Sequence, residues 1–324
     1  MKKPFEAIVV KNQKRGSKYF NLQYVTMPKD LHVRIFVRTL SVAHSPDADD
    51  IFMYYAIKFG WVDTGDVCFE NIALDIETLN VEALKTTYDI SAISFALYPK
   101  IRNDYALLRT AVSFGEGYGP KLVKRKETKL KRNFKVALSG THTTNALLFK
   151  IAYPEARIVY KNFLEIENAV LSGEVDAGVL IHESILNFND TLVVEREIWD
   201  IWKSLTQGKE LPLPLGGMAL RRSMPLLQAI TCEKSLIKAV DVAHTHQHVL
   251  SKMLLERNLV RVDDATLKTY LGLYANAHSI EMSDVQYEAI DTLFELGYKH
   301  GFYDQCIKAK EYLIPHEYET LRMS

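Results

Sequence analysis

The segment Ala177-Gly178-Val179-Leu180-Ile181-His182-Glu183-Ser184 is a short apolar run that ends in a histidine, an acid and a hydroxyl residue. Three other apolar runs, at residues 40–47, 90–95 and 136–144, end in the same way, and a helical pattern begins after each. Ligands of open α/β sheets bind at the carboxyl ends of strands. Exposed N–H groups at helix starts can bind a carboxylate or a phosphate. The four junctions therefore predict one cleft that binds a small anion.

Outward from these junctions, strands and helices alternate in two series, followed by a helical region. Strands are predicted at 33–43, 67–75, 89–94, 106–113, 134–139, 156–160, 176–181, 191–195 and up to 220, and helices at 48–60, 78–87, 142–152, 163–172, 197–205, 234–257, 264–274 and 283–300. Between the series, a glycine-rich interlobe hairpin at 114–120 precedes Lys121–Arg132, which we interpret as a solvated turn.

The pattern predicts an α/β fold with two lobes, a ligand cleft between them and a helical C-terminal part. Residues 1–39 are interpreted as an N-terminal extension, of which residues 1–30 could instead add a strand. Residues 40–120 and 222–324 are predicted to form lobe 1, which is discontinuous, and residues 121–221 to form lobe 2. No internal repeat is evident.

Composition narrows the class of protein. The chain has 324 residues, of which 48% are hydrophobic and 25% charged, as is typical of soluble globular proteins. Lys+Arg and Asp+Glu both number 40, which argues against nucleic-acid binding because that needs a surplus of cations. No apolar run is long enough to cross a membrane, and the start of the chain does not resemble a secretory signal. We expect a cytoplasmic protein without nucleic-acid or membrane partners. A homodimer is compatible with the sequence.

His182 is the first candidate catalytic residue. It follows the apolar run directly, so we expect it at the carboxyl end of a strand, where it could remove a proton from a substrate. The alternative is a half-buried histidine that only fixes its loop. Glu183 is expected to point away from His182 because adjacent side chains diverge, although it could orient a neighbouring group.

The segment around Thr143 and Thr144 looks like a helix start. Their hydroxyl and N–H groups could bind a carboxylate, and the nearby Gly140 would allow a ligand to approach closely. The alternative is that a threonine here only caps the helix.

Two clusters suggest a metal site but lack its pattern. Asp47 and Asp49 lie close together, without the ligand spacing of a calcium loop, and a helix-capping role fits either better. His244 and His248 are spaced to share one helix face, but no third zinc ligand is evident. We therefore predict no metal site at either cluster.

Several segments together resemble one family, 1,4-dihydroxy-6-naphthoate synthase of the futalosine route to menaquinone. They are residues 45–56 (SPDADDIFMYYA), 75–80 (DIETLN), 140–144 (GTHTT), 178–184 (GVLIHES) and 211–216 (LPLPLG). The likeness covers residues 40–300 in consistent order, and the combination is more specific than any single segment.

The resemblance implies a fold like that of type II periplasmic binding proteins, used inside the cell as an enzyme. It implies a lyase that converts cyclic dehypoxanthine futalosine, a small anionic substrate, to 1,4-dihydroxy-6-naphthoate without a cofactor. By resemblance, His182 is the general base. The substrate-binding residues implied are Ser45, Ala92, Ile93, Ser94, Thr143 and Thr144. The family often carries lysine where this chain has Ala92.

Two other functions remain open at this point. Chorismate dehydratase of the same pathway shares the implied fold, although the segments at 75–80, 140–144 and 178–184 favour the synthase. A solute-binding protein for an organic anion, without catalytic activity, is the alternative from another class.

Overall fold

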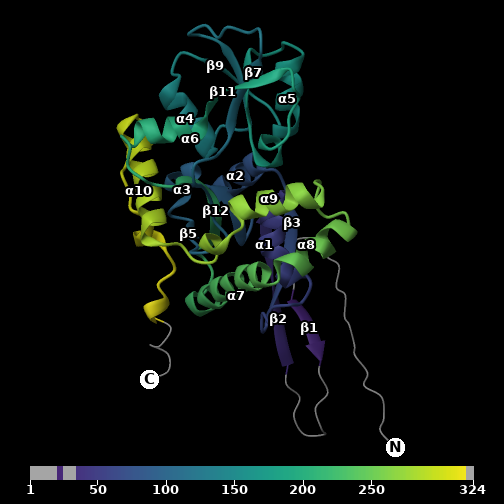
Figure 1. The fold of residues 1–324 in the computed structure, drawn as a ribbon. Coiled ribbons are helices and arrows are strands. Elements are labelled where there is room, and N and C mark those ends of the chain that lie inside the picture. Colours follow the sequence, from purple (N-terminus) through teal and green to yellow (C-terminus); the bar gives the residue numbers. More distant parts are fainter. Residues whose placement is uncertain (1–19, 25–33, 319–324) are drawn as a thin grey trace, which may run out of the picture.

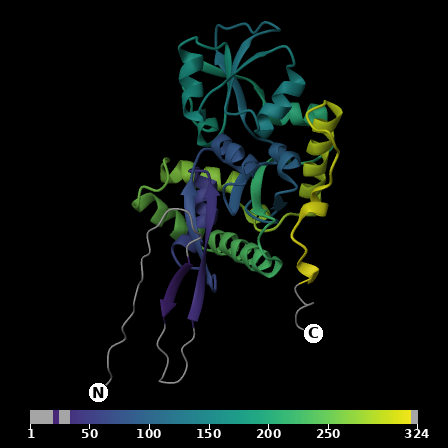
Figure 2. The ribbon, with the colours of Figure 1, turned by 180° about the vertical axis from the view of Figure 1, so that it is seen from behind.

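Two sheets, one in each lobe, organise the part of the chain that the structure describes. The structure is a computed structural model, and it describes residues 20–24 and 34–318. One sheet has seven strands and the other has five. Figure 1 shows the two lobes one above the other, and Figure 2 shows the same arrangement from behind. The α/β fold with two lobes that the sequence predicted is therefore confirmed.

Lobe 1 is built on the seven-stranded sheet. Its strands are β1 (Phe20–Tyr24), β2 (Arg34–His44), β3 (Val67–Ala73), β4 (Ile90–Ser94), β5 (Tyr105–Leu107), β6 (Ser113–Gly115) and β12 (Leu213–Arg221), and its first helices are α1 (Ala48–Lys58), α2 (Ile76–Leu84) and α3 (Tyr98–Ile101). Strands β3, β2 and β4 run parallel, and β12 pairs antiparallel with β4, β5 and β6.

Lobe 2 is built on the five-stranded sheet, in the order β11-β7-β10-β8-β9. Its elements are β7 (Lys121–Arg125), β8 (Lys135–Leu138), α4 (Thr144–Ala152), β9 (Arg157–Tyr160), α5 (Phe163–Leu171), β10 (Ala177–Leu180), β11 (Leu192–Glu197) and α6 (Ile198–Leu205). Strands β8, β9 and β10 are parallel, and every residue of β10 is buried. Burial on both faces explains why β10 reads as a continuous apolar run.

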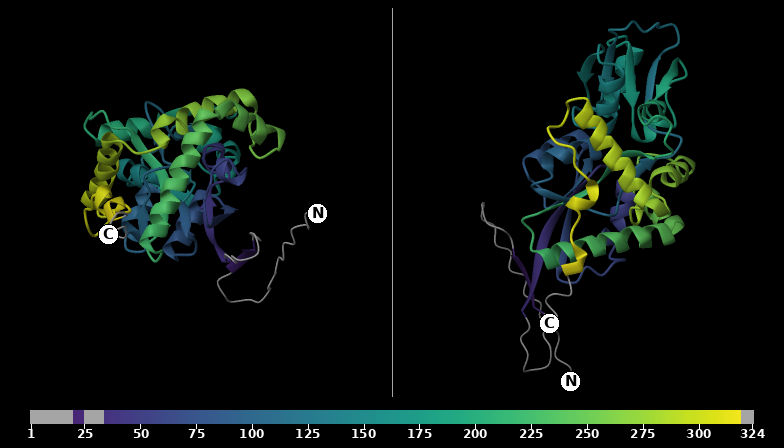
Figure 3. Two further views of the ribbon diagram at one scale, coloured as in Figure 1. Left: turned by 90° about the horizontal axis from the view of Figure 1, so that it is seen from below. Right: turned by 90° about the vertical axis from the view of Figure 1, so that its left-hand side faces the viewer.

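The C-terminal helices pack mainly on lobe 1. They are α7 (Leu226–Thr245), α8 (Gln247–Glu256), α9 (Asp264–Tyr274) and α10 (Asp284–Lys299). Helix α10 runs along one side of the molecule and reaches the level of α6 (Figures 1 and 3). Phe294 of α10 and Trp202 of α6 belong to one buried hydrophobic cluster, so α10 helps to hold the two lobes together. No described helix is long and apolar enough to span a membrane.

Two predicted elements belong elsewhere. Strand β12 pairs with β4, β5 and β6, so residues 213–221 lie in lobe 1. The predicted boundary at residue 221 had placed them in lobe 2. Residues 121–125, interpreted as a solvated turn, form strand β7, which pairs with both β10 and β11. Leu122 and Val123 are completely buried there. The flanking cations made the segment look solvent-exposed, because the interpretation considered only its charge.

Three predicted boundaries also differ. The predicted strand at 106–113 is two short strands, β5 and β6. The predicted helix at 234–257 is interrupted at His246, which lies between α7 and α8, so His244 and His248 do not share one helix face. Residues 34–39 of the predicted extension belong to β2, and residues 20–24 pair with β2 as β1. The rest of that extension lies outside the described residues.

Gly178 of β10 gives a test of packing beneath the site. A Cβ atom there would lie 2.5 Å from Cγ2 of Ile166 and 2.9 Å from Cγ2 of Val170, both in α5. We expect Gly178→Ala to lower the free energy of unfolding by about 1–3 kcal/mol through overpacking. Gly272 of α9 has no described atom within 4 Å of the same position. Gly272→Ala should therefore stabilise by up to about 1 kcal/mol through helix propensity.

Chemical denaturation of both variants measures these changes. Equal destabilisation by Gly178→Ala and Gly272→Ala would contradict the packing argument.

Candidate active site

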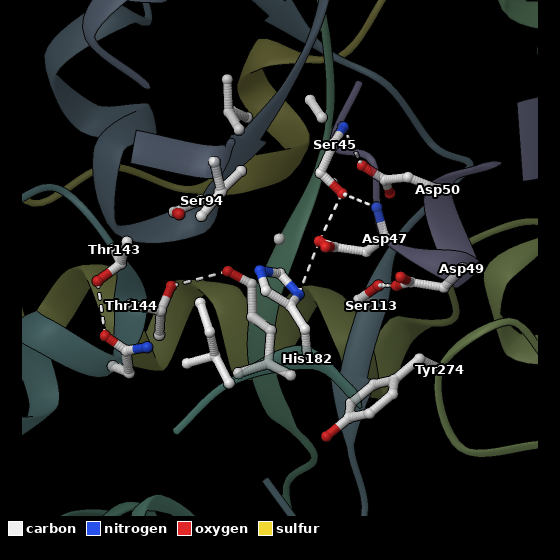
Figure 4. Close-up of a pocket in the computed structure, with 18 of the residues that line it drawn as sticks. Ser45, Asp47, Asp49, Asp50, Ser94, Ser113, Thr143, Thr144, His182 and Tyr274 are labelled. Atoms are coloured by element: carbon white, nitrogen blue, oxygen red, sulfur yellow. Dashed lines mark hydrogen bonds and ion pairs between the residues drawn. The ribbon is translucent and has the colours of Figure 1, made fainter. Parts of the chain in front are cut away.

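A cavity of about 110 Å³ lies where the strand ends of the two lobes meet. All seven residues that the sequence predicted for the site line it, namely Ser45, Ala92, Ile93, Ser94, Thr143, Thr144 and His182 (Figure 4). They come from the ends of β2, β4 and β10 and from the start of α4. The structure thus brings these segments together at one place. That they bind substrate stays a prediction.

His182 is held in an unusual conformation with one ring nitrogen engaged. Its φ is 56°, in the left-handed region that costs free energy for a residue with a side chain. Nδ1 lies 2.7 Å from Oδ2 of Asp47, and the imidazole and the ring of Phe163 pack edge to face. Nε2 is buried and has no hydrogen-bond partner among the described residues. A neutral ring that donates from Nδ1 to Asp47 therefore leaves the Nε2 lone pair free to accept a proton.

Asp47 differs from its predicted role. It occupies the N-cap position of α1, but its side chain makes no cap hydrogen bond. Its Oδ2 instead accepts a hydrogen bond of 2.5 Å from Oγ of Ser45 and contacts His182. The first N–H of the helix, on Ala48, donates to Oε1 of Glu183 at 2.9 Å. Capping by Glu183 leaves the Asp47 carboxylate available to orient the histidine.

Of the acids beside Asp47, Asp49 is buried and Asp50 is half-buried. Asp49 accepts a hydrogen bond of 2.8 Å from Oγ of Ser113, and Asp50 accepts one of 2.8 Å from the backbone N–H of Ser45. Burial raises the pKa of Asp49 to about 7, with help from the charges of Asp50 and Asp47. Burial and Asp47 likewise raise the pKa of Asp50 to about 6. Asp49 can therefore hold a proton near neutral pH, which makes it a second acid–base candidate.

The pKa of His182 is determined by opposing effects. Burial disfavours the charged ring and lowers the pKa, but the charge and hydrogen bond of Asp47 outweigh it. With smaller contributions from Glu183 and Asp49, the pKa rises to about 9. Once neutral, the ring is consequently a stronger base than an ordinary histidine. It holds its own proton more firmly, however, and must lose that proton before it can act as a base.

The predicted binding threonines already have partners within the protein. Oγ1 of Thr143 accepts from the N–H of Ala146 at 3.3 Å, so the helix-capping alternative describes its position. Oγ1 of Thr144 donates to the carbonyl of Leu215 at 2.9 Å and accepts from the N–H of Ala96 at 3.2 Å. Thr144 therefore ties α4 to lobe 1, and its hydroxyl has little capacity left for a ligand.

Ser94 is fixed in a similar way. Its Oγ accepts from Nδ2 of Asn80 at 3.0 Å, and its N–H donates to Oδ1 of the same asparagine at 2.9 Å. The hydroxyl of Ser94 keeps its own proton to donate into the cavity. Within the described chain, the cavity lining contains neither lysine nor arginine. A bound anion would thus meet neutral donors and the ring of His182, with the acids Asp47, Asp49 and Asp50 in the same lining.

Sequence reasoning missed several residues that line the cavity. Asp49, Asp50, Ser113, Tyr270 and Tyr274 were not predicted as site residues. Asp49 and Asp50 lie in the SPDADD segment that was quoted, so their position two and three residues after Asp47 was an available signal. The tyrosines come from α9, far along the chain, and nothing local marked them. In the described ranges, no set of three or more His, Cys, Asp or Glu residues is placed to hold a metal ion.

Fold and site together define the class of protein. The alkanesulfonate-binding protein SsuA of Xanthomonas axonopodis has the same fold, with a TM-score of 0.62 at 11% identity over 85% of this chain and 97% of that one. A solved structure from Archaeoglobus fulgidus is more similar, with a TM-score of 0.75 and 34% identity over 82% of this chain and 98% of that one. The chain thus has a periplasmic-binding-protein-like fold, in which the cleft carries a histidine held by an acid.

The family follows from sequence comparison. A family model described as menaquinone biosynthesis matches residues 40–299. The 1,4-dihydroxy-6-naphthoate synthase of Thermus thermophilus is 29% identical over 267 residues, which are 80% of this chain and 93% of the relative. The chain belongs to this menaquinone biosynthesis family and is an enzyme, as its resemblance implied.

The contact between Asp47 and His182 gives a direct test by NMR. Asp47→Asn keeps an acceptor but removes the charge, so the pKa of His182 should fall from about 9 towards its ordinary value of 6.5. Because the raised pKa stabilises the folded state below pH 6.5 and that stabilisation is lost as the pH rises through 9, the stability deficit of the variant should shrink over the same range.

Titration of the histidine ring carbons measures the pKa, with Asp63→Asn in an exposed loop as the control. An unchanged His182 titration in Asp47→Asn would show that the carboxylate does not hold the ring.

Proposed function

We propose that the protein is a carbon–carbon lyase that converts cyclic dehypoxanthine futalosine to 1,4-dihydroxy-6-naphthoate, with His182 as its general base and the cytoplasm as its location. The observation that carries the proposal is the unpartnered Nε2 of His182, buried at the cleft while Nδ1 is held by Asp47. The family supports a role in menaquinone biosynthesis, and the name of the Thermus relative supports the product.

The chemistry requires only modest catalytic equipment. Nε2 of His182 takes a proton from the substrate, and the electron pair left behind drives cleavage of C–C and C–O bonds. The small sugar-derived fragment leaves as the ring system becomes aromatic, which supplies driving force. Asp47 stabilises the imidazolium that forms, and the cleft holds the substrate in position for the proton transfer.

The buried acid Asp49 suits the second half of the reaction. Its raised pKa of about 7 allows it to carry a proton that the departing oxygen can accept. Neutral donors, among them the hydroxyl of Ser94 and the N–H groups at the start of α4, would bind the substrate carboxylate. A pure solute-binding protein would have no use for a histidine whose backbone is strained and whose ring is oriented by an acid.

Product analysis tests the assignment. Purified protein is offered cyclic dehypoxanthine futalosine and, separately, chorismate, and the product masses are measured. We expect 1,4-dihydroxy-6-naphthoate from the first and no reaction with the second. Dehydration of chorismate would replace the synthase by the sister enzyme, and binding without turnover of either compound would replace it by a binding protein.

His182→Asn should reduce kcat by at least about 10²–10⁴-fold, because removal of a general base costs that much. Substrate binding should be largely retained, since asparagine preserves much of the shape of the side chain. Steady-state kinetics and calorimetric titration of the substrate distinguish the two effects. Turnover within a few-fold of the wild type would remove His182 from the mechanism.

A further inference from the structure

Three carboxylate contacts cross the cleft and join the lobes around the cavity. Asp47 of lobe 1 contacts His182 of lobe 2. Glu183 of lobe 2 accepts from the N–H of Ala48 in lobe 1. Glu77 of lobe 1 accepts from two backbone N–H groups of lobe 2. Only the first of these contacts involves the group that would react with substrate.

In the contact of Glu77, one lobe supplies the carboxylate and the other supplies two N–H groups and a glycine that leaves room for it. This residue lies in the first turn of α2, and its two carboxylate oxygens accept from the N–H of Thr141 at 2.8 Å and that of His142 at 3.1 Å. A Cβ atom on Gly140 would lie 2.5 Å from the carboxyl carbon of Glu77 and 2.7 Å from its Cβ. Gly140 therefore permits the approach of the acid, where the sequence alone suggested room for a ligand.

In the contact of Glu183 the roles of the lobes are reversed, because lobe 2 supplies the carboxylate and lobe 1 supplies the N–H group. The carboxylate satisfies the first N–H of α1, where negative charge is favoured by the helix dipole. Asp47 immediately precedes that helix, so its position relative to His182 depends on where α1 sits. Each lobe thus supplies an acid that fixes backbone N–H groups of the other lobe.

We propose that Glu77 and Glu183 are positioning residues that hold the lobes closed, and that closure is what places Asp47 against His182. The inference rests on the proposed function only for the role of that pair in catalysis. If the lobes part, Asp47 stays with α1 and His182 stays with β10. The base then loses the acid that orients its ring.

Glu77 separates closure from direct electrostatic effects. The charged and titratable groups that face His182 are Asp47, Asp49 and Asp50 at α1, Glu183 beside it, and the hydroxyls of Tyr270 and Tyr274 from α9. The ring of Phe163 in α5 packs against His182 as an uncharged neighbour. Glu77 contacts the loop of Thr141 and His142 instead. A change at Glu77 should reach His182 only through the arrangement of the lobes.

The experiment uses two variants that break this contact by different routes. Glu77→Gln removes the charge, and Gly140→Ala displaces the acid by steric overlap without changing any charge. The control is Glu82→Gln, in the same helix, because Glu82 bonds only to Lys85 and Thr87 of its own lobe among the described residues. Ring NMR titration of His182 and small-angle X-ray scattering are measured on each protein without substrate, and kinetics over a range of pH follow.

We expect both variants, but not Glu82→Gln, to shift the titration of His182 down by a unit or more and to increase the radius of gyration. The value of kcat/KM should fall at least tenfold, and its acidic limb should move to lower pH because the base loses its proton more easily. The double variant should lose no more than the stronger single variant, since both act on one contact.

Other outcomes decide against the inference. An unchanged His182 titration in both folded variants would overturn it, whatever happens to activity. So would a shift in Glu82→Gln of the same size. If the wild type does not turn over the substrate but the titration and scattering change as expected, the proposed function fails while the closure mechanism stands. Thermal melting shows that each variant is folded, and Gly140→Ala serves if Glu77→Gln does not fold.

Discussion

The hydrogen bond between Asp47 and His182 connects the two lobes at the point where the chemistry would occur. Asp47 is buried and His182 is half-buried, and a charge on either is costly alone and becomes tolerable when the two are paired. The two groups come from separate lobes, so the pair exists only if the lobes are held together. The acids around it, Asp49 and Asp50, add negative charge that favours the protonated ring. Base strength, tautomer and lobe arrangement are therefore aspects of one constraint.

The fold accounts for how that constraint is met. Parallel strands place the ends of β2 and β4 on one side of the cleft and those of β8 and β10 on the other. His182 leaves β10 with a positive φ, which turns the ring towards Asp47 at a cost in backbone free energy. Glu183, the next residue, turns the other way and caps α1. Two adjacent side chains thus contact the other lobe in different ways, one at the proposed base and the other at the start of a helix.

Much of this could be predicted from the sequence because it rests on local patterns. The apolar runs predicted most strands, and the helices that follow them were predicted to within a few residues. Pairing partners have no local signature, and for this reason β12 was assigned to the wrong lobe and β7 was taken for a turn. Asp47 was interpreted as a cap because its sequence position is a cap position. Its actual partner lies in the other lobe.

A binding protein and an enzyme can share this cleft and differ in what is left unsatisfied. A binding site needs polar groups that form hydrogen bonds with the bound ligand. Catalysis needs groups whose interactions with the substrate become stronger as charge develops in the transition state. Nε2 of His182 is buried without a partner in the described structure, and Asp49 carries a raised pKa beside it. Both features cost stability in the free protein. Such a cost is understandable where a proton has to move. The cleft is kept rigid nearby by three hydroxyls that are already hydrogen-bonded within the protein, those of Thr143, Thr144 and Ser94.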